Sequence, residues 1–425
     1  MRRSADSPSP MQRAPKARPT AAHLATLCAV GIFLVLFDRP PARGQEPSAP
    51  QSTSPAQLQA AIDKLGDLDY ATRTAASRTV RRTAAPLAVA ALLRAVAEHA
   101  DGYVRYRALV LLTGFNDPRT TDAMRESLKS PNDRLRTVAY GFFEHNPDRS
   151  MIPDLLAALD KEQAEFVRPA LIRALARAAA QEPSDAIARD DTGRVAQTLV
   201  REAGRGEDFF RSVVIEALGD YKARYAFDAI TGIAKLDGPL QDDAAIALGK
   251  IGDKRAVETL AGLQRSAPRV RQPSVAAGIC LLDVNCPSHE KYLIDTLKFG
   301  DQNPGFQDLL RAAAAGLGAL GVWGRTTAVD ALFEVGIPAR DPARSPIALA
   351  LAMVAMRNTS LMMPLLEKHP ARDQAIALLA EGFDMLEEDL EKERFFSFAR
   401  RTYWAASEAS PARDLMQTLI GRLDF

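Results

Sequence analysis

The chain has 425 residues, 47% of them hydrophobic and 6% aromatic, and its 54 Lys and Arg nearly balance 53 Asp and Glu. This length and apolar content allow a large buried core, in one long domain or two to three compact ones. Alanine and leucine are frequent, which favours helices because these residues lose little side-chain entropy in a helix.

The N-terminal region has the pattern of a targeting segment. Basic residues occupy positions 2, 3, 13, 16 and 18, and an uncharged apolar run, LATLCAVGIFLVLF, covers residues 24–37. The run is short for a membrane span and typical of a signal peptide. Ala42 and Gly44 are the small residues expected before a cut at Gln45. The pattern predicts a signal peptide over residues 1–44 and a periplasmic or secreted protein; the alternative is an uncleaved membrane anchor.

Removal of residues 1–44 leaves 47 basic and 51 acidic residues, a net charge of −4. Nucleic-acid binding needs clustered Lys and Arg, so we expect no nucleic-acid partner. Residues 45–57, which begin QEPSAPQSTSPA, are rich in Pro, Ser and Gln, and this composition predicts a disordered linker.

Two of the three cysteines follow the predicted signal peptide, and they lie within CLLDVNC as Cys280 and Cys286. In one unbroken helix they would be about 9 Å apart, too far for a disulfide. Asp283 and Asn285 are weak helix formers, and Pro287 moves Cys286 out of helical geometry. If the helix ends near Leu282, an oxidising compartment favours a disulfide; the alternative is two buried thiols.

A helix–turn–helix unit of about 31 residues recurs through the rest of the chain. Its copies begin at Ala71, Val104, Leu135, Val167, Phe210, Leu240, Val270, Leu309, Ala343 and Ala371. Small or apolar residues at the fifth and ninth places of a copy lie on one face of a helix. One hairpin cannot bury its apolar face alone, so its neighbours must stack on it. The pattern predicts an all-α, right-handed α-solenoid of about ten repeats over residues 58–425.

The repeated string V-R-x-x-A, A-L-G, G-D-x-R-A-V and L is clearest at residues 243–263, DAAIALGKIGDKRAVETLAGL. It resembles the HEAT-repeat family, particularly the short bacterial HEAT-like repeats first associated with phycobilin lyases. The resemblance implies a protein-binding scaffold whose second helices line the concave side. In this chain those helices are expected near residues 120–130, 151–160, 224–236, 254–266 and 326–335.

The segment GLGALG, residues 316–321, has the G-x-G-x-x-G pattern of a dinucleotide-binding loop. That loop requires a strand before it, whereas the poly-alanine helix RAAAA precedes this segment. Gly318 and Gly321 align with Gly249 and Gly252 of an earlier repeat. We therefore expect no dinucleotide cofactor, and we interpret these glycines as repeat positions that end the first helix.

Other motifs predict no catalytic or metal site. The histidines of the mature chain are isolated from one another, and an isolated turn histidine is usually solvated: His99, His145, His289 and His369. The segment SHEKY, which contains His289, lacks the second histidine of a zinc motif. The acidic segment LEEDLEKE, residues 386–393, predicts a solvated helix face with pairs such as Glu388–Lys392. The surplus segment QEPSDAIARDDTG, residues 181–193, predicts a polar loop.

The leading hypothesis is therefore an exported, non-catalytic scaffold with no cofactor and a protein partner. Two alternatives are a HEAT-like lyase or small-molecule carrier and, if the apolar run is uncleaved, a membrane-anchored envelope spacer. The aromatic segment FFSFARRTYW, residues 395–404, is interpreted as core packing or as interface residues. The candidate protein-binding residues are Arg125, Glu126, Lys129, Glu258, Tyr403 and Trp404.

Overall fold

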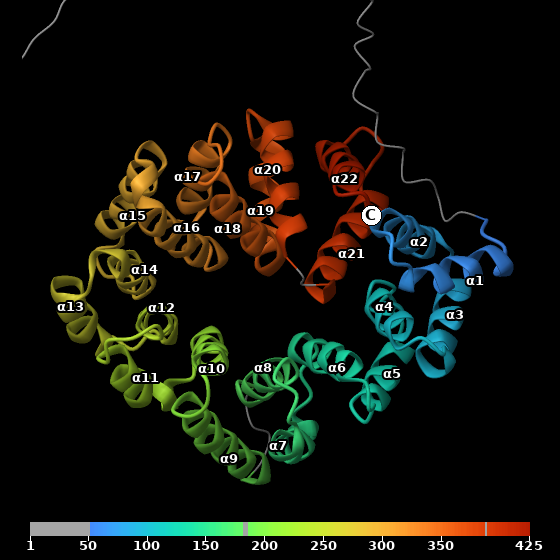
Figure 1. The fold of residues 1–425 in the computed structure, drawn as a ribbon, viewed down its shortest axis with the longest axis horizontal. Coiled ribbons are helices and arrows are strands. Elements are labelled where there is room, and N and C mark those ends of the chain that lie inside the picture. The colour runs from blue at the N-terminus through green and yellow to red at the C-terminus, as the bar shows by residue number, and fades with distance from the viewer. Residues whose placement is uncertain (1–51, 182–185, 387–388) are drawn as a thin grey trace, which may run out of the picture. The chain divides into compact units, whose positions relative to one another are not determined.

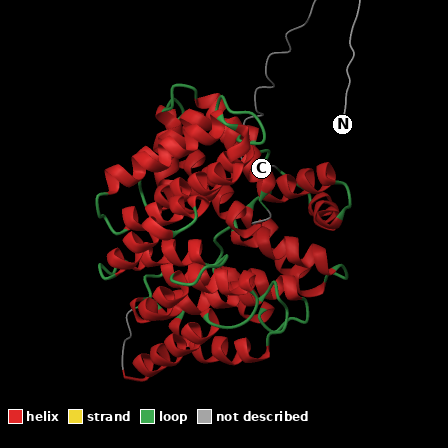
Figure 2. Ribbon diagram, turned by 60° about the vertical axis from the view of Figure 1, so that its left-hand side comes forward, coloured by secondary structure: helices red, strands yellow, loops and turns green. Residues whose placement is uncertain are grey.

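The computed structural model describes residues 52–181, 186–386 and 389–425, which belong to one compact unit from Arg43 to Phe425. The predicted signal peptide, residues 1–44, and linker residues 45–51 lie outside the described residues. The described elements are helices joined by loops (Figure 2). This confirms the all-α class expected from the composition.

The described residues form 22 α-helices, of which α2 to α21 make ten helical hairpins and α1 and α22 flank them. The flanking helices are α1 (Pro55–Asp63) and α22 (Pro411–Arg422). The first helices are α2 (Tyr70–Arg82), α4 (Gly102–Thr113), α6 (Asp133–His145), α8 (Arg168–Ala179), α10 (Asp208–Asp220), α12 (Gln241–Ile251), α14 (Gln272–Leu281), α16 (Gln307–Val322), α18 (Arg344–Arg357) and α20 (Arg372–Met385). The second helices are α3 (Ala85–Glu98), α5 (Arg119–Ser127), α7 (Ile152–Lys161), α9 (Ala186–Ala203), α11 (Phe227–Ala234), α13 (Ala256–Ser266), α15 (Cys286–Gln302), α17 (Thr326–Gly336), α19 (Thr359–Lys368) and α21 (Asp389–Ala405).

Each of the ten repeat copies found in the sequence coincides with a first helix, which confirms the solenoid prediction. Two boundaries differ from expectation. Helix α1 begins at Pro55, so residues 55–57 of the expected linker are helical; a capping box between Ser54 and Gln57 supplies the start signal. Residues 186–193, expected within a polar loop, belong to α9, because the alanine-rich sequence continues the helical pattern to Ala203.

The apolar core runs between the layer of first helices and the layer of second helices. Consecutive first helices from α4 to α20 also stack directly on one another. Glycine allows the closest of these approaches. A Cβ on Gly249 of α12 would lie 2.4 Å from the carbonyl oxygen of Gly278 in α14, and one on Gly318 of α16 would lie 3.2 Å from the Cβ of Ala350 in α18. The A-L-G element of the repeat is therefore a helix-packing position.

The GLGALG segment lies entirely inside α16, and no strand precedes it in the described chain. Gly318 does not end this helix, which continues for about one further turn to Val322, whereas Gly321 lies next to its last residue. The residue with left-handed backbone is Gly324, with φ 105°, whereas in the earlier repeat Gly252 ends α12 with φ 79°. The three glycines of the GLGALG segment therefore allow α16 to pack closely against its neighbours.

The repeated arginine near the start of the first helices caps the second helix of the preceding repeat. Carbonyl groups at a helix C-terminus lack intrahelical donors, and the helix dipole favours a cation there. The bonds are Arg105 Nε to Val96 O at 2.8 Å, Arg168 Nη1 to Leu159 O at 3.0 Å, Arg211 Nε to Ala203 O at 3.1 Å and Arg344 Nη1 to Gly336 O at 2.9 Å. The arginine of the V-R motif therefore joins consecutive repeats.

The described helices close into a ring, because α21 returns to pack against α4 and α6 (Figure 1). The first helices α4 to α18 lie on the inner side of this ring, and the second helices α5 to α17 lie outside them. The implication that second helices line the inner, concave side is therefore wrong. Ring closure gives the inner surface two opposing walls, and side chains from both walls meet there.

Candidate functional site in the lumen of the ring

The lumen contains two neighbouring cavities. The acidic cavity, of about 640 Å³, is lined by five carboxylates, those of Glu144, Glu216, Asp220, Asp389 and Glu391. The basic cavity, of about 660 Å³, is lined by three arginines, Arg357, Arg394 and Arg401. Both cavities share the side chains of His145, Met356, Arg357, Leu390 and Arg394. The two cavities are therefore continuous and carry opposite charge.

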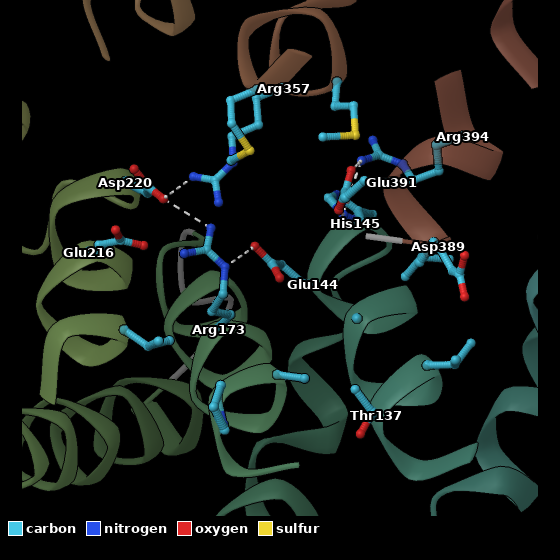
Figure 3. A pocket seen from close by; sticks show the side chains of 18 of the residues that line it. Thr137, Glu144, His145, Arg173, Glu216, Asp220, Arg357, Asp389, Glu391 and Arg394 are labelled. Carbon is cyan, nitrogen blue, oxygen red and sulfur yellow. Dashed lines mark hydrogen bonds and ion pairs between the residues drawn. The ribbon is translucent and has the colours of Figure 1, made fainter. Parts of the chain in front are cut away.

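A network of ion pairs crosses the acidic cavity and joins α6, α8, α10, α12 and α18. Arg173 binds Glu144 at 2.8 Å and Asp220 at 2.9 Å. Lys250 contacts Asp220 at 2.6 Å. Arg357 reaches Asp220 from the opposite wall at 3.4 Å (Figure 3). Burial alone would raise the pKa of Asp220, but the charges of Lys250, Arg173 and Arg357 outweigh it and hold that pKa at about 2. Asp220 is thus ionised at neutral pH.

The acidic segment at the start of α21 does not form a solvated face. Asp389 contacts Arg107 at 2.6 Å, and Glu391 binds His145 and contacts Arg394 at 2.7 Å. Burial acts to raise the pKa of Glu391, but its bonds to His145 and Arg394 lower that pKa to about 2. The expectation of a solvated face is wrong because ring closure places this turn in the lumen; Glu388 lies outside the described residues.

Glu393, one turn further along α21, is fully buried. Its carboxylate contacts Arg81 of α2 at 2.7 Å and Arg400 of α21 at 3.2 Å. Nearby, the hydroxyl of Ser397 donates to the backbone oxygen of Gly114 at the end of α4, at 2.9 Å. We call Arg81, Glu393 and Arg400 the clasp, because these side chains join the last repeat to the first.

The candidate protein-binding residues lie apart from the lumen. Arg125, Glu126, Lys129 and Glu258 are solvent-exposed, on or directly after the outer helices α5 and α13. Arg125 pairs with Asp148 at 3.0 Å, and Lys129 pairs with Glu126 at 3.2 Å. These four residues are therefore ordinary surface positions that remain open to a partner.

The aromatic segment of α21 serves mainly as core. Phe395 is buried, and Tyr403 is buried under Arg413, whose guanidinium lies 4.4 Å from the ring centroid. Tyr403 is therefore not accessible to a partner in this structure, because its ring faces α22. Trp404 is half-exposed and remains accessible.

Cys280 and Cys286 are joined by a disulfide, with their Cα atoms 4.1 Å apart. Helix α14 ends at Leu281, as the sequence predicts, and Asp283 and Asn285 adopt left-handed backbone in the turn. Helix α15 then begins at Cys286, so the two cysteines face each other across a tight turn. Both side chains are buried.

Sequence reasoning missed the lumen residues, although a signal was present. The eleventh place of four successive repeat copies carries a charged or titratable residue in the last turn of a first helix: His145, Arg177, Asp220 and Lys250. Of these, His145 and Asp220 line the lumen cavities. When one position of successive first helices repeatedly carries a charge while the rest of each helix packs in the core, these side chains form a polar strip along the inner face of the solenoid. Treated singly, as His145 was, such residues look like solvated turn positions.

Within the described residues, no group of three or more His, Cys, Asp or Glu is placed to hold a metal ion. In the same part of the chain no single helix has the length and apolar character to cross a membrane. Helices α18 and α19 reach the necessary length and apolar composition only when they are taken together, and the chain bends sharply between them.

Residues 89–176 match a family model described as HEAT repeats, so this segment carries HEAT repeats, as the repeated string indicates. The described architecture is that of an α-solenoid. No curated protein sequence matches the chain.

Several solved structures have a similar arrangement. A structure of the CpcE–CpcF complex of phycocyanin lyase from Nostoc sp. is 18% identical with a TM-score of 0.39, over 64% of this chain and 97% of that one. An importin β structure is 15% identical with a TM-score of 0.40, over 86% of this chain and 55% of that one. A structure concerning cadherin and β-catenin is 12% identical with a TM-score of 0.32, over 88% of this chain and 85% of that one. Likenesses at this level do not define a function for this chain.

Proposed function

We propose that this protein is an exported, non-catalytic scaffold that binds a protein partner on one rim of the ring. The observation that carries the rim assignment is a stripe of exposed apolar side chains at the loops between repeats. Solenoids of stacked repeats typically present an extended surface for binding. Export is supported by the basic region and apolar run of residues 1–44.

The rim stripe comprises five exposed apolar residues, Phe166, Phe209, Leu236, Val270 and Phe306, which are 41% to 76% exposed. Each lies in, or beside, the loop that precedes a first helix, in five successive repeats. Because the two helices of each hairpin run in opposite directions, all first helices run the same way, and the loops that precede them lie on the same rim. The stripe therefore follows one edge of the ring from α8 to α16.

Arg269, the residue before Val270, packs against Phe306 of the rim stripe and against its neighbour Phe299. The rings of Phe299 and Phe306 pack edge to face with centroids 4.9 Å apart. The guanidinium of Arg269 lies 5.7 Å and 5.9 Å from these two centroids. Aromatic and arginine side chains that stand together and exposed are typical of interface hot spots, and extended exposed apolar surface marks an interaction site.

The experiment is a pull-down from the native envelope fraction with the purified full chain as bait and mass spectrometry of the bound proteins. Aspartate at both Val270 and Phe306 places charge on the stripe and leaves the core unchanged. We expect this double variant to lose a reproducible partner, because one charge in an apolar interface costs several kcal/mol. Met385→Asp is the matched control: its side chain is 44% exposed but lies at the far end of a first helix, on the opposite rim.

The rim assignment is contradicted if the double variant still binds the partner. It is also contradicted if Met385→Asp loses the partner to the same extent as the double variant. Turnover of a bilin and acceptor protein by the purified chain contradicts the non-catalytic proposal and supports the lyase alternative. N-terminal sequencing and carbonate extraction of membranes test export. A chain that begins at Gln45 supports the cleaved signal, and an intact N-terminus retained in the membrane pellet supports the anchored spacer.

A further inference from the structure

The basic cavity is built by four segments of the chain. These are the turn between α4 and α5, the end of α6, the junction of α18 with α19, and α21. The first two segments belong to neighbouring repeats, as do the last two, and ring closure brings the two pairs together because α21 packs against α4 and α6. Its volume of about 660 Å³ lies in the range of small-molecule sites in proteins.

Positive charge in the basic cavity is not balanced within it. Its one lining carboxylate, Asp117, is held by the guanidinium of Arg119 through two bonds of 2.9 Å. The acidic partners of Arg357 and Arg394 belong to the acidic cavity. The exposed Arg401 has no acceptor among the described residues. Three guanidinium groups therefore face a space with no free carboxylate among the described residues.

A helix N-terminus adds to this positive potential. Asn358, Thr359 and Ser360 line the cavity, and α19, a helix of ten residues, begins at Thr359. The side chain of Asn358 accepts from the backbone N–H of Leu361. The backbone N–H groups of Thr359 and Ser360 have no acceptor in the described part of the chain. N–H groups of a first helical turn favour anions.

A buried hydroxyl provides an independent indication of a ligand. Thr120 lines the cavity, is only 3% exposed, and its Oγ1 has no hydrogen-bond partner among the described residues. Buried hydroxyl groups without a partner are costly and rare in folded proteins. The Oγ1 atom is itself almost wholly covered, so it would bond to a molecule in this cavity once the Thr120 side chain turns toward it.

We propose that the basic cavity binds a small organic anion through a carboxylate or phosphate group held by Arg357, Arg394 and Arg401. Guanidinium groups bind both kinds of oxyanion through paired, charge-assisted hydrogen bonds. The N-terminus of α19 and the Thr120 hydroxyl supply further donors. The basic cavity shares no lining residue with the rim stripe, although Phe166 and Phe209 of the stripe line the adjoining acidic cavity.

The test is isothermal titration of the purified full chain with citrate and, separately, with pyrophosphate, at low and high salt. Arg401→Gln removes one guanidinium that holds no other described group. We expect it to weaken binding of the preferred probe about tenfold, the effect of losing one charge-assisted hydrogen bond. Thr120→Val keeps the side-chain volume and removes only the hydroxyl, and it should weaken binding about fivefold with no loss of thermal stability. Arg401→Lys should keep part of the affinity.

Arg265→Gln is the matched control, since Arg265 is an exposed arginine of the outer helix α13. Binding of citrate but not pyrophosphate assigns a carboxylate ligand, and the reverse assigns a phosphate. Absence of binding by both probes overturns the proposal. Equal weakening by Arg265→Gln and Arg401→Gln also overturns it, because that result indicates non-specific attraction to the protein's charge.

Discussion

Replacing Glu393 with glutamine tests whether the clasp holds the ring closed. Glutamine keeps the size and one oxygen acceptor of the side chain but removes its charge. In the structure this carboxylate is fully buried and contacts Arg81, 7% exposed, at 2.7 Å, and Arg400, 14% exposed, at 3.2 Å. The variant therefore leaves two largely buried guanidinium groups facing each other without a counter-charge.

Breaking a buried ion pair by removing one partner costs about 3 to 5 kcal/mol. We take about 3 kcal/mol for Glu393→Gln, because the amide oxygen keeps one hydrogen bond. At about 1.4 kcal/mol for each factor of ten, this raises the opening equilibrium of the last repeat more than 100-fold. In a solenoid each repeat contacts chiefly its neighbours, so the opening should be local.

Amide hydrogen exchange measures such local opening directly. We expect amides of α21, α22 and the contacting face of α2 to exchange about 100-fold faster, while those of α10 to α14 keep their rates. Glu258→Gln, an exposed glutamate on the outer helix α13, is the matched control and should change nothing. Exchange in α21 within about threefold of the parent chain, or equal acceleration in every helix, would refute a local clasp.

Three further predictions concern the network, the disulfide and the repeat packing. Because the pKa of Asp220 is lowered to about 2 from its usual value near 4, its ionised form contributes about 2 kcal/mol above pH 4, which is lost as pH falls toward 2. Urea unfolding of Asp220→Asn should therefore show lower stability at pH 7 but a smaller loss between pH 5 and pH 2.5; an unchanged pH profile contradicts this. Alanine at both Cys280 and Cys286 should cost about 2 kcal/mol in thermal unfolding, and thiol titration of the denatured, unreduced parent should find neither cysteine free. Gly249→Ala should destabilise by about 2 kcal/mol because its Cβ meets the backbone of α14, whereas Gly232→Ala, with open space around it, should stabilise slightly; equal effects contradict the packing role.

The repeat architecture was predictable because each repeat carries its own local signals. Apolar residues at the fifth and ninth places specify a helix face, and the arginine of the V-R motif and the A-L-G glycine specify contacts to the adjacent repeat. All of these contacts join residues within about one repeat length. The turn at Cys280 and Cys286 was predictable for the same reason, since Asp283 and Asn285 end a helix by their own backbone preferences.

The lumen was not predictable from such signals because it joins repeats that are far apart in sequence. Glu391 and His145 are separated by 246 residues, Arg81 and Glu393 by 312, and no local pattern marks either pair. Read locally, the acidic segment of α21 has the spacing of a solvated helix face. Its carboxylates are shielded from solvent because the solenoid curves until α21 reaches α4 and α6 and, through Glu393 and Arg81, α2.

The sequence by itself therefore determined the helices, their pairing and the order of stacking, since these depend on short-range periodicity and on contacts between neighbouring repeats. The tertiary structure decided which helices face inward, that the ring closes, and that two cavities of opposite charge lie inside it. Small rotations between successive repeats accumulate into curvature. No single motif encodes that sum, so the residues that meet across the lumen become apparent only once the whole ring is assembled.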